Sequence, residues 1–241
     1  MIQKIDLSKK YGNKHISILY PGNAIGLTDT GIGSIGRIDQ ADINGGTTIE
    51  MHPHANDEIL SYFRLGKVIH TDSSKTTETI SRKKLMLMKA GKVFYHEENI
   101  IDKLEGLQIF IRPQTVDYAP EVTFYDLEQE DSLNMWRLIA SNANKTPLVF
   151  TSETAVFDMA LDVVKEQAFP EFEMPNKVLL LYAFQGNILV NGCLSLSKGE
   201  CIITDEENTM FSTTSGAEVV LFMTNKDQNC FKDGMFSGNK G

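Results

Sequence analysis

The segment TTIEMHPHANDEILSYF, residues 47–63, contains two histidines separated by one proline. Alternate residues of a β-strand project from the same face, so a strand here would present His52 and His54 together. The segment FYHEEN repeats this spacing with His96 and Glu98. Two such pairs on adjacent strands would bring three imidazoles and one carboxylate to one point. That donor set binds iron, zinc, nickel or copper, and the carboxylate favours the harder ions among them.

The acidic ligand is not fixed by spacing alone. Glu58 stands four residues after His54 and shares its parity, so it competes with Glu98 for this role. Four protein ligands leave two positions of a six-coordinate ion open to water, substrate or dioxygen, as a catalytic metal requires. A zinc site with four protein ligands is normally closed, so the open positions favour iron or manganese.

The other histidines carry simpler predictions. His70 follows an apolar run with the parity of a solvent-facing strand residue, so we expect it to point to solvent. Asp72 and Ser73 are then expected in a turn, and His15 is expected at the surface. A polar strand end is also the alternative for residues 52–54 taken alone. The second pair at matching parity, within apolar strands, favours the metal site.

The elements that must position these side chains are strands. Short apolar runs, rich in β-branched and aromatic residues, are separated by Gly, Asn, Ser or charged turns throughout the chain. These runs cover residues 59–71, 84–96, 104–113, 177–192, 194–204 and 217–224. Residues 152–167 mix the helix and strand periods, and we predict strands there. The acid-rich segment 114–134, which contains Pro120, is predicted to connect two halves.

The two halves resemble each other. Each has an apolar strand, a turn at Gly66 or Gly186, further strands, and then the tripeptide EEN. This layout predicts an all-β architecture of two tandem jelly-roll β-barrels. We place an N-terminal domain with the metal site at residues 1–125, and a C-terminal domain without histidine ligands at residues 126–241.

Composition excludes some classes of partner. The chain has 23 basic and 32 acidic residues, a net charge of −9, and no basic cluster beyond residues 82–84. We therefore expect no direct nucleic-acid binding, which needs a clustered basic face. No segment has the apolar length of a signal peptide or the run of about 18 apolar residues that spans a bilayer. We expect a cytoplasmic protein without membrane contact.

The cysteines and the C-terminal residues complete the predictions. Cys193, Cys201 and Cys230 are an odd number without CxxC spacing, so free thiols are predicted. A Cys193–Cys201 pair across a hairpin is the alternative. The tail KDGMFSGNKG, residues 232–241, is predicted to be mobile.

Two segments resemble a known family. Gly46, His52, His54 and Glu58 stand at the spacing of the first cupin motif. More narrowly, residues 51–74 and 85–98 are similar to the pirin family, with its PHPH segment, His-x-Asp-Ser step and His-x-Glu end. Residues 104–113 and 136–141 also fall where pirins place comparable strands. The resemblance covers most of residues 40–141.

The resemblance implies a ligand set. Pirins hold a metal, usually iron, in the N-terminal cupin through three histidines and one glutamate, which correspond here to His52, His54, His96 and Glu98. Manganese, nickel, copper and zinc are the other candidates. The resemblance thus decides for Glu98 over Glu58, which becomes a residue of the pocket or its surroundings.

The sequence departs from the pirin pattern in three places. Ala55 replaces the usual Arg, residues 81–84 replace a Pro-Gly-Asp turn, and Val93 replaces a Gly. These departures concern the mouth of the site rather than the ligands.

Two functions follow from the resemblance. The first is a dioxygenase of the quercetin 2,3-dioxygenase type, which would open a flavonol-like or other enolisable aromatic substrate with O2, with Glu98 as general base. The second is a non-enzymatic regulator that binds partner proteins according to the redox state of the metal. A bicupin whose metal site has no natural role is a third. A planar substrate could be walled by apolar residues that otherwise serve as core: Met51, Phe63, Met86, Met88, Phe94 and Tyr95.

Overall fold

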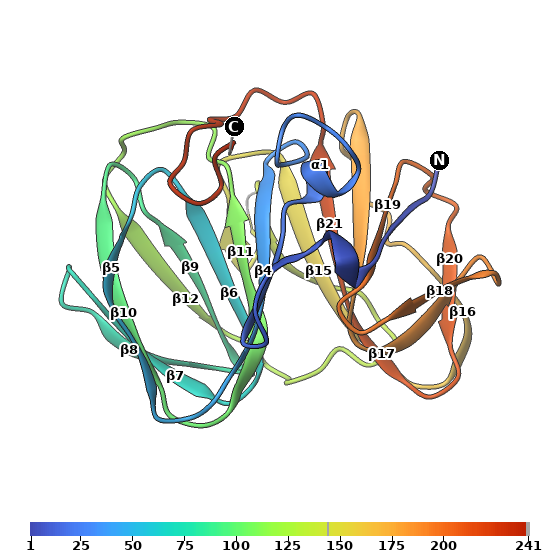
Figure 1. Cartoon of the computed structure of the whole chain (residues 1–241), viewed down its shortest axis with the longest axis horizontal. Coiled ribbons are helices and arrows are strands. Elements are labelled where there is room, and N and C mark those ends of the chain that lie inside the picture. The colour runs from blue at the N-terminus through green and yellow to red at the C-terminus, as the bar shows by residue number, and fades with distance from the viewer. Residues whose placement is uncertain (144, 240–241) are drawn as a thin grey trace. The chain divides into compact units, whose positions relative to one another are not determined.

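The computed structural model describes residues 1–143 and 145–239, and it is built almost entirely from β-strands (Figure 1). The chain divides into two compact units. The N-terminal unit comprises Lys10–Glu130, Phe150–Ser152 and Asn229–Gly241. The C-terminal unit comprises Met1–Lys9, Asp131–Val149 and Glu153–Gln228. The all-β class predicted from the sequence is confirmed, whereas the division into domains 1–125 and 126–241 stays a prediction.

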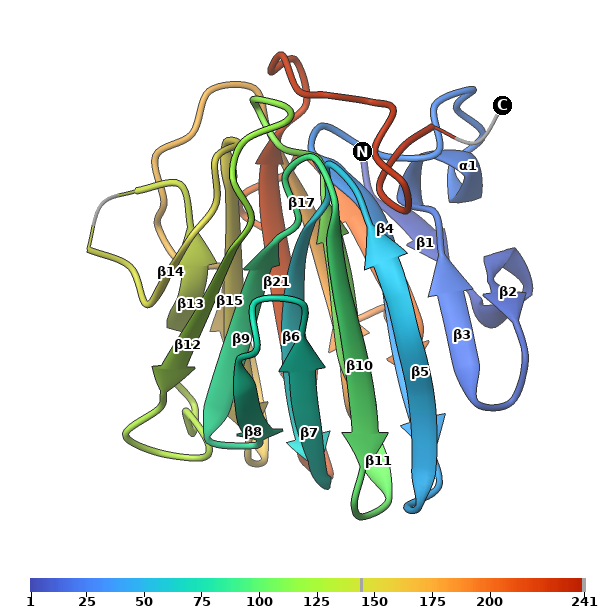
Figure 2. The ribbon, with the colours of Figure 1, turned by 90° about the vertical axis from the view of Figure 1, so that its left-hand side faces the viewer.

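The N-terminal unit is a curled antiparallel sheet with the order β2-β3-β4-β11-β6-β9-β8-β7-β10-β5, and β12 pairs with β9 (Figure 2). Its strands are β2 (Tyr11–Gly12), β3 (Ile16–Leu19), β4 (Ile35–Ile43), β5 (Thr47–His54), β6 (Glu58–Leu65), β7 (Lys67–Asp72), β8 (Thr77–Ser81), β9 (Lys84–Lys89), β10 (Phe94–Ile100), β11 (Leu104–Ile111) and β12 (Glu121–Asp126). A short helix, α1 (Pro21–Ala24), precedes β4.

Alternation of buried and exposed residues explains these strands. In β10, Phe94, His96, Glu98 and Ile100 are buried, while the residues between them are more exposed. Apolar inward-facing residues from several strands form the core, which includes Phe63, Val68, Ile80, Met86 and Ile100. The polar residues of β10 therefore project into the buried interior, where an unpaired polar group would be costly.

The predicted turn at Gly66 is present between β6 and β7. Gly66 has a φ of +85°, and a Cβ atom here would lie 2.4 Å from the carbonyl oxygen of Lys103. Both the left-handed backbone and the close approach require glycine. This turn sets the register of β7, and β7 carries a residue of the site described below.

The C-terminal unit is a second antiparallel sheet with the order β1-β19-β17-β21-β15-β13-β14, in which only the short β13–β14 pair is parallel. Strands β16, β18 and β20 extend it. Its elements are β1 (Gln3–Ile5), η1 (Leu7–Lys9), β13 (Arg137–Ser141), β14 (Leu148–Val149), β15 (Thr154–Leu161), β16 (Val164–Ala168), β17 (Lys177–Val190), β18 (Leu194–Ser197), β19 (Cys201–Thr204), β20 (Met210–Thr213) and β21 (Ala217–Asn225).

The inner face of this second sheet is apolar. Phe157, Met159, Leu181 and Phe211 belong to one buried cluster, and Trp136 packs against it. The strands predicted for residues 152–167 are confirmed by β15 and β16.

Two further predictions concern single features. All three cysteines are free thiols, as predicted, with Cys193 exposed and the other two buried. In the described residues, none of the helices has the length and apolar character needed to cross a membrane.

The prediction of a mobile C-terminal tail is wrong for residues 232–239. Within the N-terminal unit, Asp57 accepts hydrogen bonds from the backbone N–H groups of Phe236 and Ser237 at 3.0 and 2.8 Å. Arg112 donates to the carbonyl oxygen of Ser237 at 2.9 Å. The tail looked mobile because it is rich in glycine and polar residues, but its partners Arg112 and Asp57 are 125 and about 180 residues away in sequence.

Candidate metal centre

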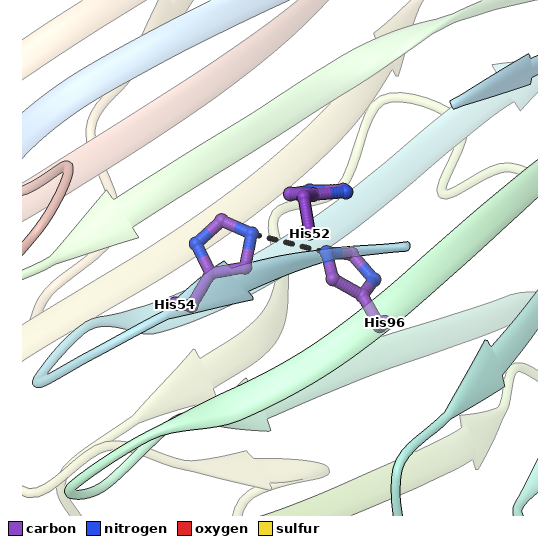
Figure 3. A group of neighbouring side chains, drawn as sticks. All are labelled: His52, His54 and His96. Carbon is purple, nitrogen blue, oxygen red and sulfur yellow. Dashed lines mark hydrogen bonds between the residues drawn. The ribbon is translucent and has the colours of Figure 1, made fainter. Parts of the chain in front are cut away.

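Strands β5 and β10 bring three histidines together. In the antiparallel register, His96 lies opposite His52, and Phe94 lies opposite His54. The ligand atoms of the three imidazoles all lie within 4.8 Å of one another. Figure 3 shows a ring nitrogen of His54 directed at a ring nitrogen of His96. These two Nε2 atoms are 3.0 Å apart. His54 and His96 are buried and His52 is half-buried, so the group is open to solvent on the side of His52.

The outer nitrogen of His52 has a defined partner. Its Nδ1 lies 2.8 Å from the carbonyl oxygen of Glu50, which can only accept a hydrogen bond. Nδ1 therefore carries the proton, and Nε2 keeps its lone pair. Ligating histidines are commonly fixed in this way by an acceptor behind the ring.

His96 is backed by a histidine that we predicted to face solvent, and that prediction is wrong. His70 is 0% exposed. Its Nε2 lies 3.2 Å from Asp72 Oδ2, and its Nδ1 lies 3.3 Å from His96 Nδ1. Because the carboxylate accepts from Nε2 of His70, Nδ1 of His70 is the acceptor for the N–H of His96. The lone pair of His96 is thereby left on Nε2, the nitrogen that faces His54.

The error at His70 has a structural cause. His70 lies opposite Glu98 in the pairing of β7 with β10, and cross-strand partners share a face of the sheet. Val68, His70 and Asp72 are all buried, so these residues, and not Ile69, form the inward-facing side of β7. The predicted turn at Asp72 is confirmed, because its Oδ1 also accepts the N–H groups of Ser74 and Thr76.

Burial favours the neutral imidazole at His54, His70 and His96. Desolvation lowers the pKa values of His54 and His70. The same effect, together with the neighbouring imidazoles, lowers the pKa of His96 to about 2. Neutral imidazole is the form that binds metals, since a protonated ring has no lone pair to donate.

The residues present fit a transition-metal ion. Two nitrogens 3.0 Å apart match two adjacent ligands at right angles around an ion with metal–nitrogen distances of about 2.1 Å. Nδ1 of His54 is buried and has no hydrogen-bond partner, which is unusual for a polar atom in a protein interior. A three-histidine donor set of this kind suits divalent iron, nickel, copper or zinc.

Glu98 is buried near the three histidines but is not part of the group. A β-bulge falls between His96 and Glu98, so that Glu98 lies opposite Ile49 on β5. Its Oε1 accepts a hydrogen bond from Gln108 Nε2 at 2.8 Å. Burial raises its pKa to about 7. Strand parity alone could not foresee the bulge, and the role of Glu98 as fourth ligand stays a prediction.

Glu58 also lies outside the group. It is 0% exposed at the start of β6, and its two carboxylate oxygens lie 3.2 and 3.0 Å from the backbone nitrogen of Thr151, which donates to them. Burial raises the pKa of Glu58 to about 7. The matching parity of Glu58 and His54 in sequence does not bring them together, because a turn separates β5 from β6.

Sequence reasoning missed the aromatic contacts of His54. The ring of Phe236 lies 4.8 Å from the ring of His54, and Phe110 lies 5.6 Å from Phe236. The guanidinium of Arg37 stacks over Phe110 and Phe236 at 5.1 and 5.3 Å. No local sequence signal marks Phe236, because it reaches the site through the C-terminal segment.

The apolar residues weighed as a pocket wall are mainly core. Phe63, Met86, Met88 and Phe94 are buried in hydrophobic clusters. The other two, Met51 and Tyr95, are 46% and 44% exposed. A cavity beside Glu98, lined also by Phe63 and Gln108, has a volume of about 30 Å³. It can hold one or two water molecules but is too small for an aromatic ring.

Comparisons with known proteins show what the chain is similar to. Residues 27–111 match the family model described as Pirin. The chain is 26% identical over 196 residues to "Quercetin 2,3-dioxygenase" of Escherichia coli K12, a match covering 80% of this chain and 83% of that protein.

Solved structures establish the fold. The crystal structure of YhhW from Escherichia coli has a TM-score of 0.78 and 21% identity, covering 93% of this chain and 97% of that one. The structure of the bacterial pirin YhhW from Escherichia coli in complex with nickel(II) has a TM-score of 0.76 and 20% identity, covering 93% and 99%. The predicted bicupin fold is confirmed, and residues 27–111 are similar to the pirin family.

Proposed function

We propose that the protein is a metal-dependent dioxygenase of the quercetin 2,3-dioxygenase type, acting with O2 on a flavonol-like or other enolisable aromatic substrate. The observation that carries the proposal is the convergence of three imidazoles, two of them with Nε2 atoms 3.0 Å apart. Its relatives named quercetin 2,3-dioxygenase support the substrate class. One divalent ion, Fe(II) in the first place, is the proposed cofactor.

Each residue of the proposed site has a separate role. His52, His54 and His96 would hold the ion through Nε2, and Glu98 is the proposed fourth ligand. A bound divalent ion supplies Lewis acidity, which lowers the pKa of a coordinated hydroxyl, and open positions for substrate and O2. Glu98 would take the proton of the substrate hydroxyl. Gln108, which donates to Glu98 at 2.8 Å, would hold that carboxylate in place.

The surroundings of the histidines would protect the site. Phe110 and Phe236 cover His54 with apolar surface, which keeps water away from that side of the group. The exposed side of His52 would then be the entrance for a planar substrate. Exclusion of water from the buried side strengthens each electrostatic interaction with the bound substrate.

Metal content of the purified protein tests the proposal. We expect about one transition-metal ion per chain, with loss in a His96→Ala variant and retention in a matched His15→Ala variant. His15 is a suitable control because it is partly exposed and belongs to a different strand region, where its Nδ1 lies 3.3 Å from the carbonyl oxygen of Asp42.

The reaction itself needs a second assay. Protein reconstituted anaerobically with ferrous iron, and in parallel with manganese, nickel, copper or zinc, should consume O2 and cleave quercetin with at least one metal. Retention of the metal without cleavage by any of them would refute the dioxygenase proposal. The regulator alternative would then be tested by partner capture with the ferrous and ferric forms.

A further inference from the structure

The C-terminal segment, defined here as residues 230–239, is fastened next to the three histidines by Asp57. The Asp57 carboxylate is 0% exposed. It accepts hydrogen bonds from the backbone N–H groups of Phe236 and Ser237 and, at 2.7 Å, from the hydroxyl of Ser237. Glycine is required at position 234, because a Cβ atom there would lie 2.7 Å from Asp57 Oδ1.

A partly buried ion pair holds the same segment at a second point. Arg112, with no exposed surface, donates from Nε to the carbonyl oxygen of Ser237 and pairs with Asp29 at 2.6 Å. Lys232 of the segment also pairs with Asp29, at 2.8 Å. Charge-assisted hydrogen bonds of this kind are strong when buried. The segment is therefore a fixed part of the N-terminal unit, and Asp57 has little freedom to rotate.

The fixed carboxylate points at a candidate metal ligand. Asp57 Oδ2 lies 3.8 Å from Nδ1 of His54. That nitrogen has no hydrogen-bond partner. Asn56, with a φ of 51°, makes the turn that returns Asp57 toward His54. Phe236 packs on the ring of His54 from the same segment, so the segment contacts both the imidazole and its facing carboxylate.

The hydrogen bonds of the group assign a tautomer to His54 in this state. The chain from Asp72 through His70 places the proton of His96 on Nδ1 and its lone pair on Nε2. In the 3.0 Å contact between Nε2 atoms, His54 must then be the donor. The neutral ring of His54 accordingly carries its proton on Nε2, and its Nδ1 is a bare lone pair.

Metal binding reverses this assignment. To bind an ion through Nε2, a neutral His54 must carry its proton on Nδ1. That buried N–H needs an acceptor, and the carboxylate that faces it is Asp57. Carboxylates behind ligating histidines fix the ring and its tautomer, and their loss typically weakens metal binding about 10–100-fold.

We propose that Asp57, locked by residues 230–239, is a positioning residue that accepts the Nδ1 proton of His54 when the three histidines hold a metal ion. This inference rests on the proposed metal centre. It makes the C-terminal segment a structural part of the site. It also explains why a buried carboxylate lies so close to an unpaired imidazole nitrogen.

Asp57→Asn tests the proposal in the full-length chain. The Asn oxygen can keep the hydrogen bonds from Phe236 and Ser237 that Oδ1 accepts, while its NH2 group would face His54 in place of Oδ2. We expect zinc to bind about 10–100-fold more weakly by competition titration. Glu97→Gln, next to His96 but in a half-buried position between inward-facing residues, removes the same charge and should leave the affinity unchanged.

Nitrogen NMR of the zinc-loaded wild type provides a readout that requires no variant. Zinc is suitable because it is diamagnetic. We expect His54 to coordinate through Nε2 with a proton on Nδ1, and the metal-free protein to carry that proton on Nε2. Coordination through Nδ1, or equal zinc affinity in Asp57→Asn and the wild type, would overturn the inference while leaving the metal centre intact. Absence of zinc binding by the wild type would overturn the metal centre and the inference together.

Discussion

Glu58 offers the most quantitative test of the electrostatics in this fold. The carboxylate has no exposed surface, and its hydrogen bonds come from Thr151. Lys89 lies opposite Glu58 in the pairing of β6 with β9, but its ammonium pairs with Glu121 at 3.3 Å. Desolvation therefore dominates and raises the pKa of Glu58 from 4.5 to about 7.

The raised pKa makes stability depend on pH in a defined direction. Between pH 4.5 and about 7, the folded protein keeps a proton on Glu58 that the unfolded chain has released. The free energy of unfolding must then fall as the pH rises through this window. Above about pH 7, the shift corresponds to a loss of roughly 3 kcal/mol in the free energy of unfolding. This loss is absent below the pKa that Glu58 has in the unfolded chain.

Glu58→Gln removes the titration and keeps a similar shape. We expect the variant to gain stability relative to the wild type as the pH rises, by up to roughly 3 kcal/mol above about pH 7, with little difference near pH 4.5. Urea unfolding of metal-free protein across this range measures the difference. Glu128→Gln, at an exposed position, is the matched control and should follow the wild type.

Two outcomes would refute this reasoning. Parallel stability curves for the wild type and Glu58→Gln would show that the carboxylate is not penalised by burial. Loss of metal from Glu58→Gln would show that Glu58, rather than Glu98, supplies the acidic ligand. We expect the metal content to be unchanged, because Glu58 does not lie among the gathered histidines.

Two shorter predictions concern the histidines. His70→Phe should weaken metal binding about 10–100-fold, because His96 loses the acceptor for its Nδ1 proton; competition titration beside His15→Phe measures this, and an unchanged affinity would contradict the proposed hydrogen-bond chain. In the metal-free protein, the pKa of His96 is lowered to about 2 by burial. Neutral His96 therefore contributes to the free energy of unfolding above pH 6.5, the pKa of histidine in the unfolded chain, and this contribution is lost as the pH falls below that value. His96→Gln should therefore lose less stability than the wild type between about pH 7 and pH 5, as read by urea unfolding, and equal losses would argue against a neutral buried imidazole.

Local periodicity was sufficient to predict part of the site. Residues i and i+2 of one strand share a face whatever the surrounding fold, so His52 and His54 could be paired from the sequence. The second pair placed His96 on a matching face, and the structure gathers these three. Strand positions were predictable for the same reason, because alternation is a property of the strand itself.

The failures lie where the three-dimensional fold decides. The inward face of β7 depends on its register with β10, which placed His70 inside. A bulge after His96 places Glu98 opposite Ile49, which strand parity does not indicate, and the role of Glu98 as a ligand stays a prediction. The contacts of Asp57 with Phe236 and Ser237 join residues about 180 positions apart, and no pattern within a single segment can indicate them.

The hydrogen bonds behind the three imidazoles explain why this arrangement should favour the binding of a metal ion. His52 is oriented by the carbonyl oxygen of Glu50 and His96 by His70, so both already present a lone pair on Nε2. Only His54 has its proton on the inner side, where it makes the 3.0 Å contact with His96. Transfer of that single proton to Nδ1, facing Asp57, would complete three converging lone pairs without any change in net charge. Metal loading would then require little rearrangement of the backbone, because strands β5 and β10 already hold all three rings in place.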